Sequence, residues 1–129
     1  MSHPNEALLR DAYAAFAKED IPGFLAHCTP GVMFRIPGKG LLAGYHTTEG
    51  FFAKLGPAMQ AVRGTFREDV LHVVAGDDQG VVVVAQSAER DGTLYKWNCS
   101  HWWRIEEGRL AEFWEFVDDP AAYESAWKV

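Results

Sequence analysis

Two side chains in the C-terminal half of the sequence are of the types needed for proton transfer near neutral pH. His101 lies in a predicted strand at 93–105, and Glu115 lies in the next predicted strand at 109–117. An imidazole can act as a general base, and a neighbouring carboxylate can hold its tautomer or, when desolvated, act as the acid. Gln86, one strand earlier, can donate a hydrogen bond to a carbonyl or enolate oxygen. This set suits cofactor-free proton transfer next to a carbonyl, as in aldol cyclisation, isomerisation or dehydration.

The same pair also has an interpretation without catalysis. A His and a Glu on neighbouring strands can form a buried hydrogen-bonded pair that only stabilises the fold. The strand register matters too, because a shift by one residue turns every side chain to the other face of the sheet. Glu112 would then face inward, and Glu115 would face solvent or a partner subunit. From the sequence, both alternatives stay open.

The elements that must position these residues are strands joined by tight turns. After Gly64 the spacing of apolar residues changes from about 3.6 to 2, which is typical of strands. Asp-Gly between two alternating runs is a strong hairpin signal. Four strands are predicted, at 65–75, 79–89, 93–105 and 109–117, with turns at 76–78, 91–92 and 107–108.

Helical spacing dominates the part of the chain before Gly64. Proline in a first turn, and Asp or Thr just before it, mark helix starts. The predicted elements are a helix from Pro4, a short helix from its cap Asp20 to about Cys28, a break at 29–31, a strand at 32–36, a glycine-rich loop to Gly44, and a third helix from Thr47 or Thr48. Pro57 should kink or split the third helix, because it cannot bond to the carbonyl of Ala53. The chain closes with a short amphipathic tail that carries Tyr123 and Trp127.

The order of elements is therefore two helices, a strand, a helix and four hairpin-linked strands. This order indicates an α+β fold with an antiparallel sheet, not a parallel βαβ fold. The chain of 129 residues has the size of one domain, which we expect to cover 1–129. The two middle strands are long, so the sheet should twist and curl.

Composition narrows the function classes. The net charge is −6, which argues against nucleic acid and against an anionic membrane surface, because both need clustered Lys and Arg. The N-terminus lacks the apolar core of a signal peptide, and the longest apolar run, 81–85, is too short to cross a bilayer. We therefore expect a cytoplasmic protein in which Cys28 and Cys99 are buried thiols.

Familiar cofactor and nucleophile motifs are missing from the sequence. The five His residues show no zinc spacing, and the two Cys are far apart. There is no P-loop ending, no G-x-S-x-G elbow and no GxGxxG after a strand. We therefore expect neither a metal nor a cofactor.

Several segments carry a family resemblance that covers nearly the whole chain. They are Phe34-Arg35-Ile36-Pro37-Gly38, Leu42 to His46, Phe51-Phe52, Ser100 to Ile105, Glu107 to Leu110 and Glu112 to Phe116. With them the sequence resembles the SnoaL-like and ketosteroid-isomerase-like proteins of the nuclear transport factor two-like superfamily. The resemblance implies a cone-shaped, cystatin-like α+β barrel, in which a curved antiparallel sheet wraps around the N-terminal helices. A cavity inside the cone is implied as well.

The resemblance also implies which residues face the cavity. His101 falls where ketosteroid isomerases have a protonated Asp, and strand parity then points Glu115 and Gln86 inward, with Tyr13 or Tyr45 at the cavity edge. Their catalytic Asp corresponds to Ile36, which cannot take a proton, so steroid isomerisation of that type is not expected. The implied substrate-binding residues are Tyr13, Phe34, Ile36, Phe52, Val84, Cys99, Trp103 and Phe113.

Three functions compete at this point. The first is a cofactor-free enzyme acting on an apolar or aromatic carbonyl compound, with His101 as base. The second is a module that binds such a ligand without chemistry. The third is a structural dimer whose cavity is filled by its own side chains. In all three, outward-facing Trp102 and Trp114 would leave an apolar patch on the sheet, which predicts a homodimer through the outer sheet face.

Overall fold

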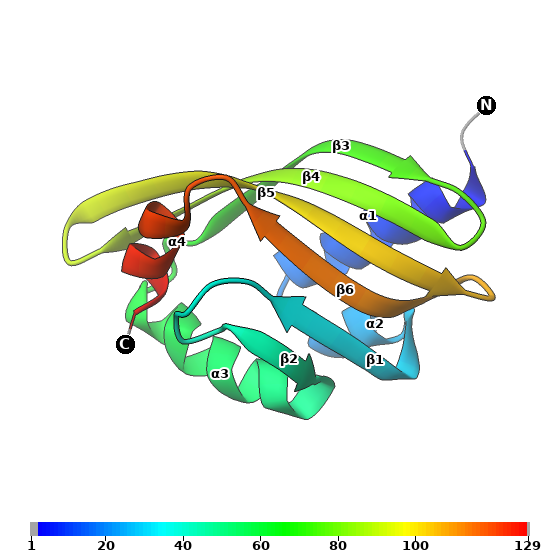
Figure 1. Ribbon diagram of the computed structural model, residues 1–129, viewed down its shortest axis with the longest axis horizontal. Helices are drawn as coiled ribbons and strands as arrows, with labels where there is room; N and C mark the ends of the chain where they lie inside the picture. The colour runs from blue at the N-terminus through cyan, green and yellow to red at the C-terminus, as the bar shows by residue number, and fades with distance from the viewer. Residues whose placement is uncertain (1–2, 129) are drawn as a thin grey trace.

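A computed structural model describes residues 3–128 of the protein (Figure 1). The elements follow in the order α1 (Pro4–Ala17), α2 (Ile21–Leu25), β1 (Cys28–Ile36), β2 (Gly44–Thr47), α3 (Thr48–Ala61), β3 (Arg67–Ala75), β4 (Gln79–Arg90), β5 (Thr93–Glu106), β6 (Arg109–Val117) and α4 (Pro120–Trp127). The strands form one curved sheet in the order β2-β1-β6-β5-β4-β3. Neighbours are antiparallel except β1 and β6, which run parallel. The predicted α+β class is confirmed.

Local sequence explains where the helices begin. Asp20 and Thr47 cap α2 and α3, and their side chains accept hydrogen bonds from the backbone N–H of Gly23 and Gly50. The sequence predicted Asp20 as a cap and a start of the third helix at Thr47 or Thr48. Of the kink or split predicted at Pro57, the split is wrong, because α3 runs through Pro57 without a break. Pro57 and Ala53 lie on the exposed side of the helix, so water can satisfy the carbonyl that proline leaves free.

The sheet has one strand more than the sequence pattern indicates. The four residues of β2 pair antiparallel with β1, and so short a segment shows no alternation of its own. The strand β1 also starts at Cys28, through the predicted break at 29–31. Its pairing with β6 is irregular between Cys28 and Met33, which accommodates Pro30 without an N–H in the ladder. The predicted second helix accordingly ends at Leu25.

The helices cover one face of the sheet, and this inner face carries the core. α1 lies against β3 and β4, while α3 lies against β1 and β2 (Figure 1). Gly80 permits the close approach of α1, because a Cβ there would lie 2.7 Å from Cδ1 of Leu9. No helix within residues 3–128 is long and apolar enough to span a membrane.

The strand register fixes which side chains face the helices. His101 pairs directly with Glu115, so both lie on the inner face, where they are 3% and 8% exposed. Arg104 pairs with Glu112, which lies on the outer face. The register is therefore the one that places Glu115, and not Glu112, beside His101.

Candidate functional site

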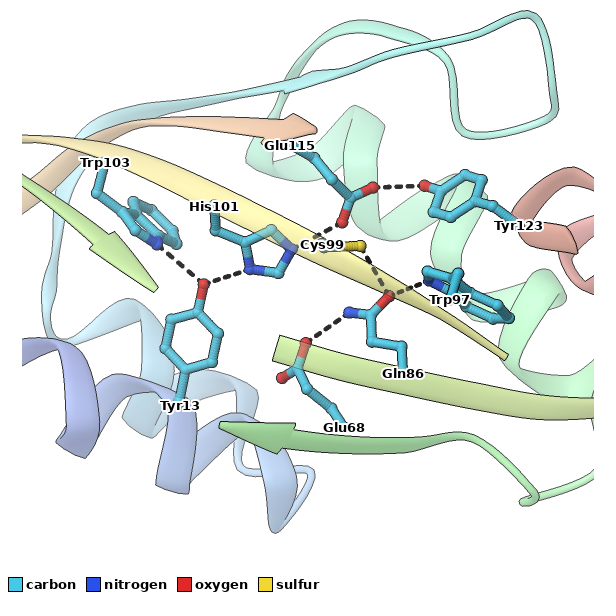
Figure 2. A network of polar contacts seen from close by, with 9 residues as sticks. All are labelled: Tyr13, Glu68, Gln86, Trp97, Cys99, His101, Trp103, Glu115 and Tyr123. Atoms are coloured by element: carbon cyan, nitrogen blue, oxygen red, sulfur yellow. Dashed lines mark hydrogen bonds and ion pairs between the residues drawn. The ribbon is translucent and has the colours of Figure 1, made fainter. Parts of the chain in front are cut away.

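His101 lies at the centre of a buried chain of hydrogen bonds between α1 and the sheet. Its Nδ1 is 2.5 Å from the hydroxyl oxygen of Tyr13, and its Nε2 is 2.9 Å from Oε2 of Glu115 (Figure 2). All three side chains are less than 10% exposed. The three residues come from α1, β5 and β6, so the chain exists only in the folded protein.

The partners at both ends of this chain favour one assignment of its protons. Trp103 Nε1, which can only donate, lies 3.0 Å from the Tyr13 hydroxyl. The Tyr13 oxygen accepts that bond and gives its own proton to Nδ1 of His101. The neutral imidazole then carries its proton on Nε2 and donates it to Glu115. The second carboxylate oxygen of Glu115 accepts from the hydroxyl of Tyr123 at 2.6 Å.

A second chain of hydrogen bonds runs beside the first. Trp97 Nε1 donates to Oε1 of Gln86 at 2.6 Å, and the Cys99 thiol donates to the same oxygen at 3.3 Å. This orients the amide, because its nitrogen must then point the other way. That nitrogen donates to Oε2 of Glu68 at 2.6 Å (Figure 2). Both chains therefore end on a carboxylate.

Glu68 reaches the site because of a bulge in β3. The pairing of β3 with β4 skips Leu71. On the N-terminal side of this bulge, Val70 pairs with Val84 and Glu68 pairs with Gln86. An unbroken ladder would have put Asp69 opposite Gln86 instead. The bulge reverses the alternation and turns Glu68 to the inner face, while Asp69 is exposed.

Burial controls the proton affinity of this site. Burial raises the pKa of the Glu68 carboxyl, and the charge of Glu115 adds to the rise. His101 and the hydrogen bond from Gln86 lower this pKa, but the net shift is upward. Burial also raises the pKa of Tyr13 well above its ordinary value, with the Glu68 charge adding to the effect. The pKa of Tyr123 is raised by burial and then by Glu115. Both phenols therefore stay protonated and act as donors.

Cys99, His101 and Glu115 form the one group of three possible metal ligands found within residues 3–128. Their ligand atoms lie within 4.8 Å of one another. Each of these atoms already has a hydrogen-bond partner in the protein. Burial and the charges of Glu115 and Glu68 raise the pKa of the Cys99 thiol, which keeps it from the thiolate form that metals bind. The group therefore has the donor types for a metal but holds them in mutual hydrogen bonds.

The two chains border an internal cavity of about 80 Å³ between the inner sheet face and the helices. Its lining is mostly aromatic. It includes the sequence-predicted His101, Glu115, Gln86, Tyr13, Phe34, Ile36, Phe52, Trp103 and Phe113, together with Phe16, Phe24, Leu42, Phe51, Leu55, Met59, Phe66, Glu68, Tyr123 and Trp127.

Three sequence-predicted positions lie elsewhere. Val84 and Cys99 face inward but do not line the cavity; both are almost fully buried, and the Cys99 thiol turns to Gln86. Tyr45 is 48% exposed, and its hydroxyl donates to Glu112 on the outer face. Tyr13 is thus the tyrosine at the cavity. The sequence pattern does not indicate Glu68 or Tyr123 as site residues, since the first depends on the bulge in β3 and the second on how α4 folds back.

Comparison with known proteins agrees with this architecture. The family model of the SnoaL-like domain matches residues 9–113. The chain is 32% identical over 122 residues to the uncharacterized protein Rv0034 of Mycobacterium tuberculosis, covering 93% of each. The structure of Bal32a, from a soil-derived mobile gene cassette, superposes with a TM-score of 0.87 at 28% identity, covering 96% of both chains. An NTF2-like protein from Burkholderia pseudomallei has a TM-score of 0.82 at 24% identity, covering 97% of this chain and 98% of the other.

The fold is therefore that of the NTF2-like class, with a sheet curved around its helices and polar groups on the inner sheet face. Within that class, the chain belongs to the SnoaL-like domain family.

Proposed function

We propose that the protein binds a small apolar or aromatic carbonyl compound in its cavity and transfers a proton next to the carbonyl without a cofactor. The observation that carries this proposal is the buried chain Tyr13–His101–Glu115, which reaches an aromatic cavity from three separate elements. Proton transfer in enzymes commonly uses such a row of three groups, in which a nucleophile or donor bonds to a His and a carboxylate orients that His. The reaction type would be that of a cyclase, isomerase or dehydratase.

The proton path follows from the hydrogen bonds. Both nitrogens of His101 are engaged, so a ligand proton reaches Nδ1 through the Tyr13 hydroxyl. Tyr13 takes up the ligand proton as it passes its own to His101, and Glu115 stabilises the resulting imidazolium. A free tyrosinate never forms, which agrees with the raised pKa of Tyr13. Gln86 has a second N–H that can bind the developing oxyanion.

A second candidate, a binding module without chemistry, is favoured by one observation. Both nitrogens of His101 and both oxygens of Glu115 already have protein partners. The cavity is also small beside the roughly 300–1,000 Å³ of common ligand sites. A ligand larger than one ring therefore needs the half-buried Phe51, Phe52 and Met59 to move.

Binding and turnover, measured on the wild type and two variants, separate the two candidates. Thermal unfolding is followed with a panel of aromatic ketones, lactones and epoxides, and any hit is assayed for turnover. A ligand at a hundred times its dissociation constant should raise the melting temperature by roughly 10 °C. His101→Gln should keep binding and lose turnover, while the matched surface variant His72→Gln should keep both. Turnover retained in His101→Gln would contradict the assignment, and binding without turnover in the wild type would favour the module.

We further propose that the protein acts as a cytoplasmic homodimer joined through the outer sheet face. Trp102 and Trp114 pack edge to face there, and Trp114 stacks beside Phe116, which is 53% exposed. Arg35 lies over Trp114 and Tyr45, 4.4 and 4.6 Å from their ring centres. An aromatic patch with an arginine has the composition of interface centres.

A further inference from the structure

The cavity contains more negative than positive groups. Glu68 and Glu115 both line it, and no Lys or Arg is among its lining residues. The only lining side chain that can become a cation is His101, and its Nε2 already bonds to Glu115. A buried carboxylate without a counter-charge is unfavourable, so a cation inside the cavity would be stabilised.

Glu68 offers the free acceptor in this site. Its Oε2 accepts from Gln86, and no hydrogen bond within residues 3–128 reaches its Oε1. Both nitrogens of His101 and both oxygens of Glu115 are engaged. Among the charged groups of the cavity, Glu68 is thus the one with an oxygen left for a ligand.

Aromatic rings supply the remaining walls. Eleven of the nineteen lining residues are Phe, Tyr or Trp. The faces of such rings carry negative partial charge and attract organic ammonium groups, most strongly when both are desolvated. The rings and the free carboxylate oxygen together can therefore bind a ligand that has an ammonium group on an apolar skeleton.

The surface near Glu68 carries more negative than positive groups, as the cavity does. Glu68 also lines a cleft between the end of α1, α3 and the start of β3, together with Glu19, Asp69 and Arg67. Phe16, Phe52, Leu55, Met59 and Phe66 are shared by this cleft and the cavity. Three acids and one base in a cleft concentrate cations and repel anions.

We infer that the ligand of this cavity carries a protonated amine, bound by Oε1 of Glu68 and by the surrounding ring faces. This rests on the proposed function in one respect, namely that the cavity admits a ligand. It adds the substrate class: an aromatic or apolar carbonyl compound with an ammonium group, in preference to a neutral or anionic one.

Three probes of nearly equal shape test this inference: benzylamine, benzyl alcohol and benzoate, near neutral pH. Dissociation constants are measured from tryptophan fluorescence and from thermal shifts. We expect benzylamine to bind at least about tenfold more tightly than benzyl alcohol, with benzoate weakest. Glu68→Gln should remove this preference while leaving benzyl alcohol within about twofold. Asp91→Asn, the loss of an exposed carboxylate in the turn after β4, should keep the preference.

Each outcome of that experiment decides something. Benzyl alcohol or benzoate binding as tightly as benzylamine overturns the ammonium inference and leaves the ligand-binding cavity standing. Binding of none of the three means that the cavity does not admit a single ring, so the inference and the proposed function both fail. The affinities of the three probes are ranked on the wild type alone, so the test holds even if Glu68→Gln does not fold.

Discussion

The hydroxyl of Tyr13 and Nδ1 of His101 lie 2.5 Å apart, although the two residues are 88 positions apart in the chain. This bond joins α1 to the middle of the sheet. It also favours one tautomer of the imidazole: Trp103 donates to the Tyr13 oxygen, and the Tyr13 proton finds its partner at Nδ1. One helix residue thus links the packing of the fold to the chemistry of the site.

Removal of that hydroxyl should destabilise the fold. Tyr13→Phe leaves Nδ1 of His101 and the indole N–H of Trp103 buried without partners, which should cost about 1–3 kcal/mol of unfolding free energy. Urea denaturation measures it. Tyr45→Phe is the control, because the Tyr45 hydroxyl is on the exposed outer face and its loss should cost under about 0.5 kcal/mol. Equal effects of the two variants would contradict the account of the buried chain.

The tautomer of His101 is a separate prediction. In its neutral form the ring should carry its proton on Nε2, because Nδ1 accepts from Tyr13 and Nε2 donates to Glu115. Nitrogen NMR of labelled histidine distinguishes the two tautomers, and the exposed His72 serves as an internal reference for an unconstrained ring. A proton found on Nδ1 would show that the proposed direction of proton transfer is wrong.

Glu68 should make stability depend on pH. Its pKa is raised above its ordinary value of 4.5, so the folded protein holds this proton more tightly than the unfolded chain. The stabilisation is therefore complete below pH 4.5 and is lost as the pH rises through the folded-state pKa. Glu68→Gln does not titrate, so its melting temperature should improve relative to wild type as the pH rises above 4.5. A pH series of thermal unfolding checks this, with Asp69→Asn as the control; a constant difference between Glu68→Gln and wild type would refute it.

The outer aromatic patch predicts the oligomeric state. Light scattering after size exclusion should give twice the chain mass of 14.4 kDa. Phe116→Glu should shift the protein to the monomer, because it places a charge among Trp102 and Trp114. Leu71→Glu is the control, since Leu71 is similarly exposed but lies on the edge strand β3, three strands away from β6. A wild-type monomer at micromolar concentration would rule out this dimer.

Much of the site was accessible from the sequence because the strands alternate clearly between inward and outward side chains. Asp91-Gly92 and Glu107-Gly108 take positive φ in their turns, as tight hairpins require. The first of these turns joins β4 and β5, which pair without a break. The pairing of β5 with β6, in contrast, shifts between Arg104 and Ile105 and skips Ala111, and this irregularity brings Glu115 opposite His101. The alternation along each strand and the family resemblance nevertheless placed His101, Glu115 and Gln86 inside. Their inward orientation is what the structure shows.

The rest of the site depends on contacts that cannot be inferred from a local sequence pattern. Glu68 lies in an alternating run whose parity is reversed by the bulge at Leu71, and nothing in the side chains of that run marks the extra residue. Tyr123 bonds to Glu115 only because α4, capped by Asp119, folds back onto the sheet. The two missed residues are thus those whose position depends on an irregularity and on a tertiary turn.

The exchange of ketone α-protons for deuterium tests the central claim most directly. Phenylacetone at saturating concentration is incubated with the protein in deuterium oxide, and proton NMR follows the loss of the α-proton signals. We predict exchange well above the buffer rate with wild type and with His72→Gln, and exchange at the buffer rate with His101→Gln. Phenylacetone that binds to the wild type but exchanges no faster than in buffer would contradict proton transfer at this site and leave a protein that only binds its ligand.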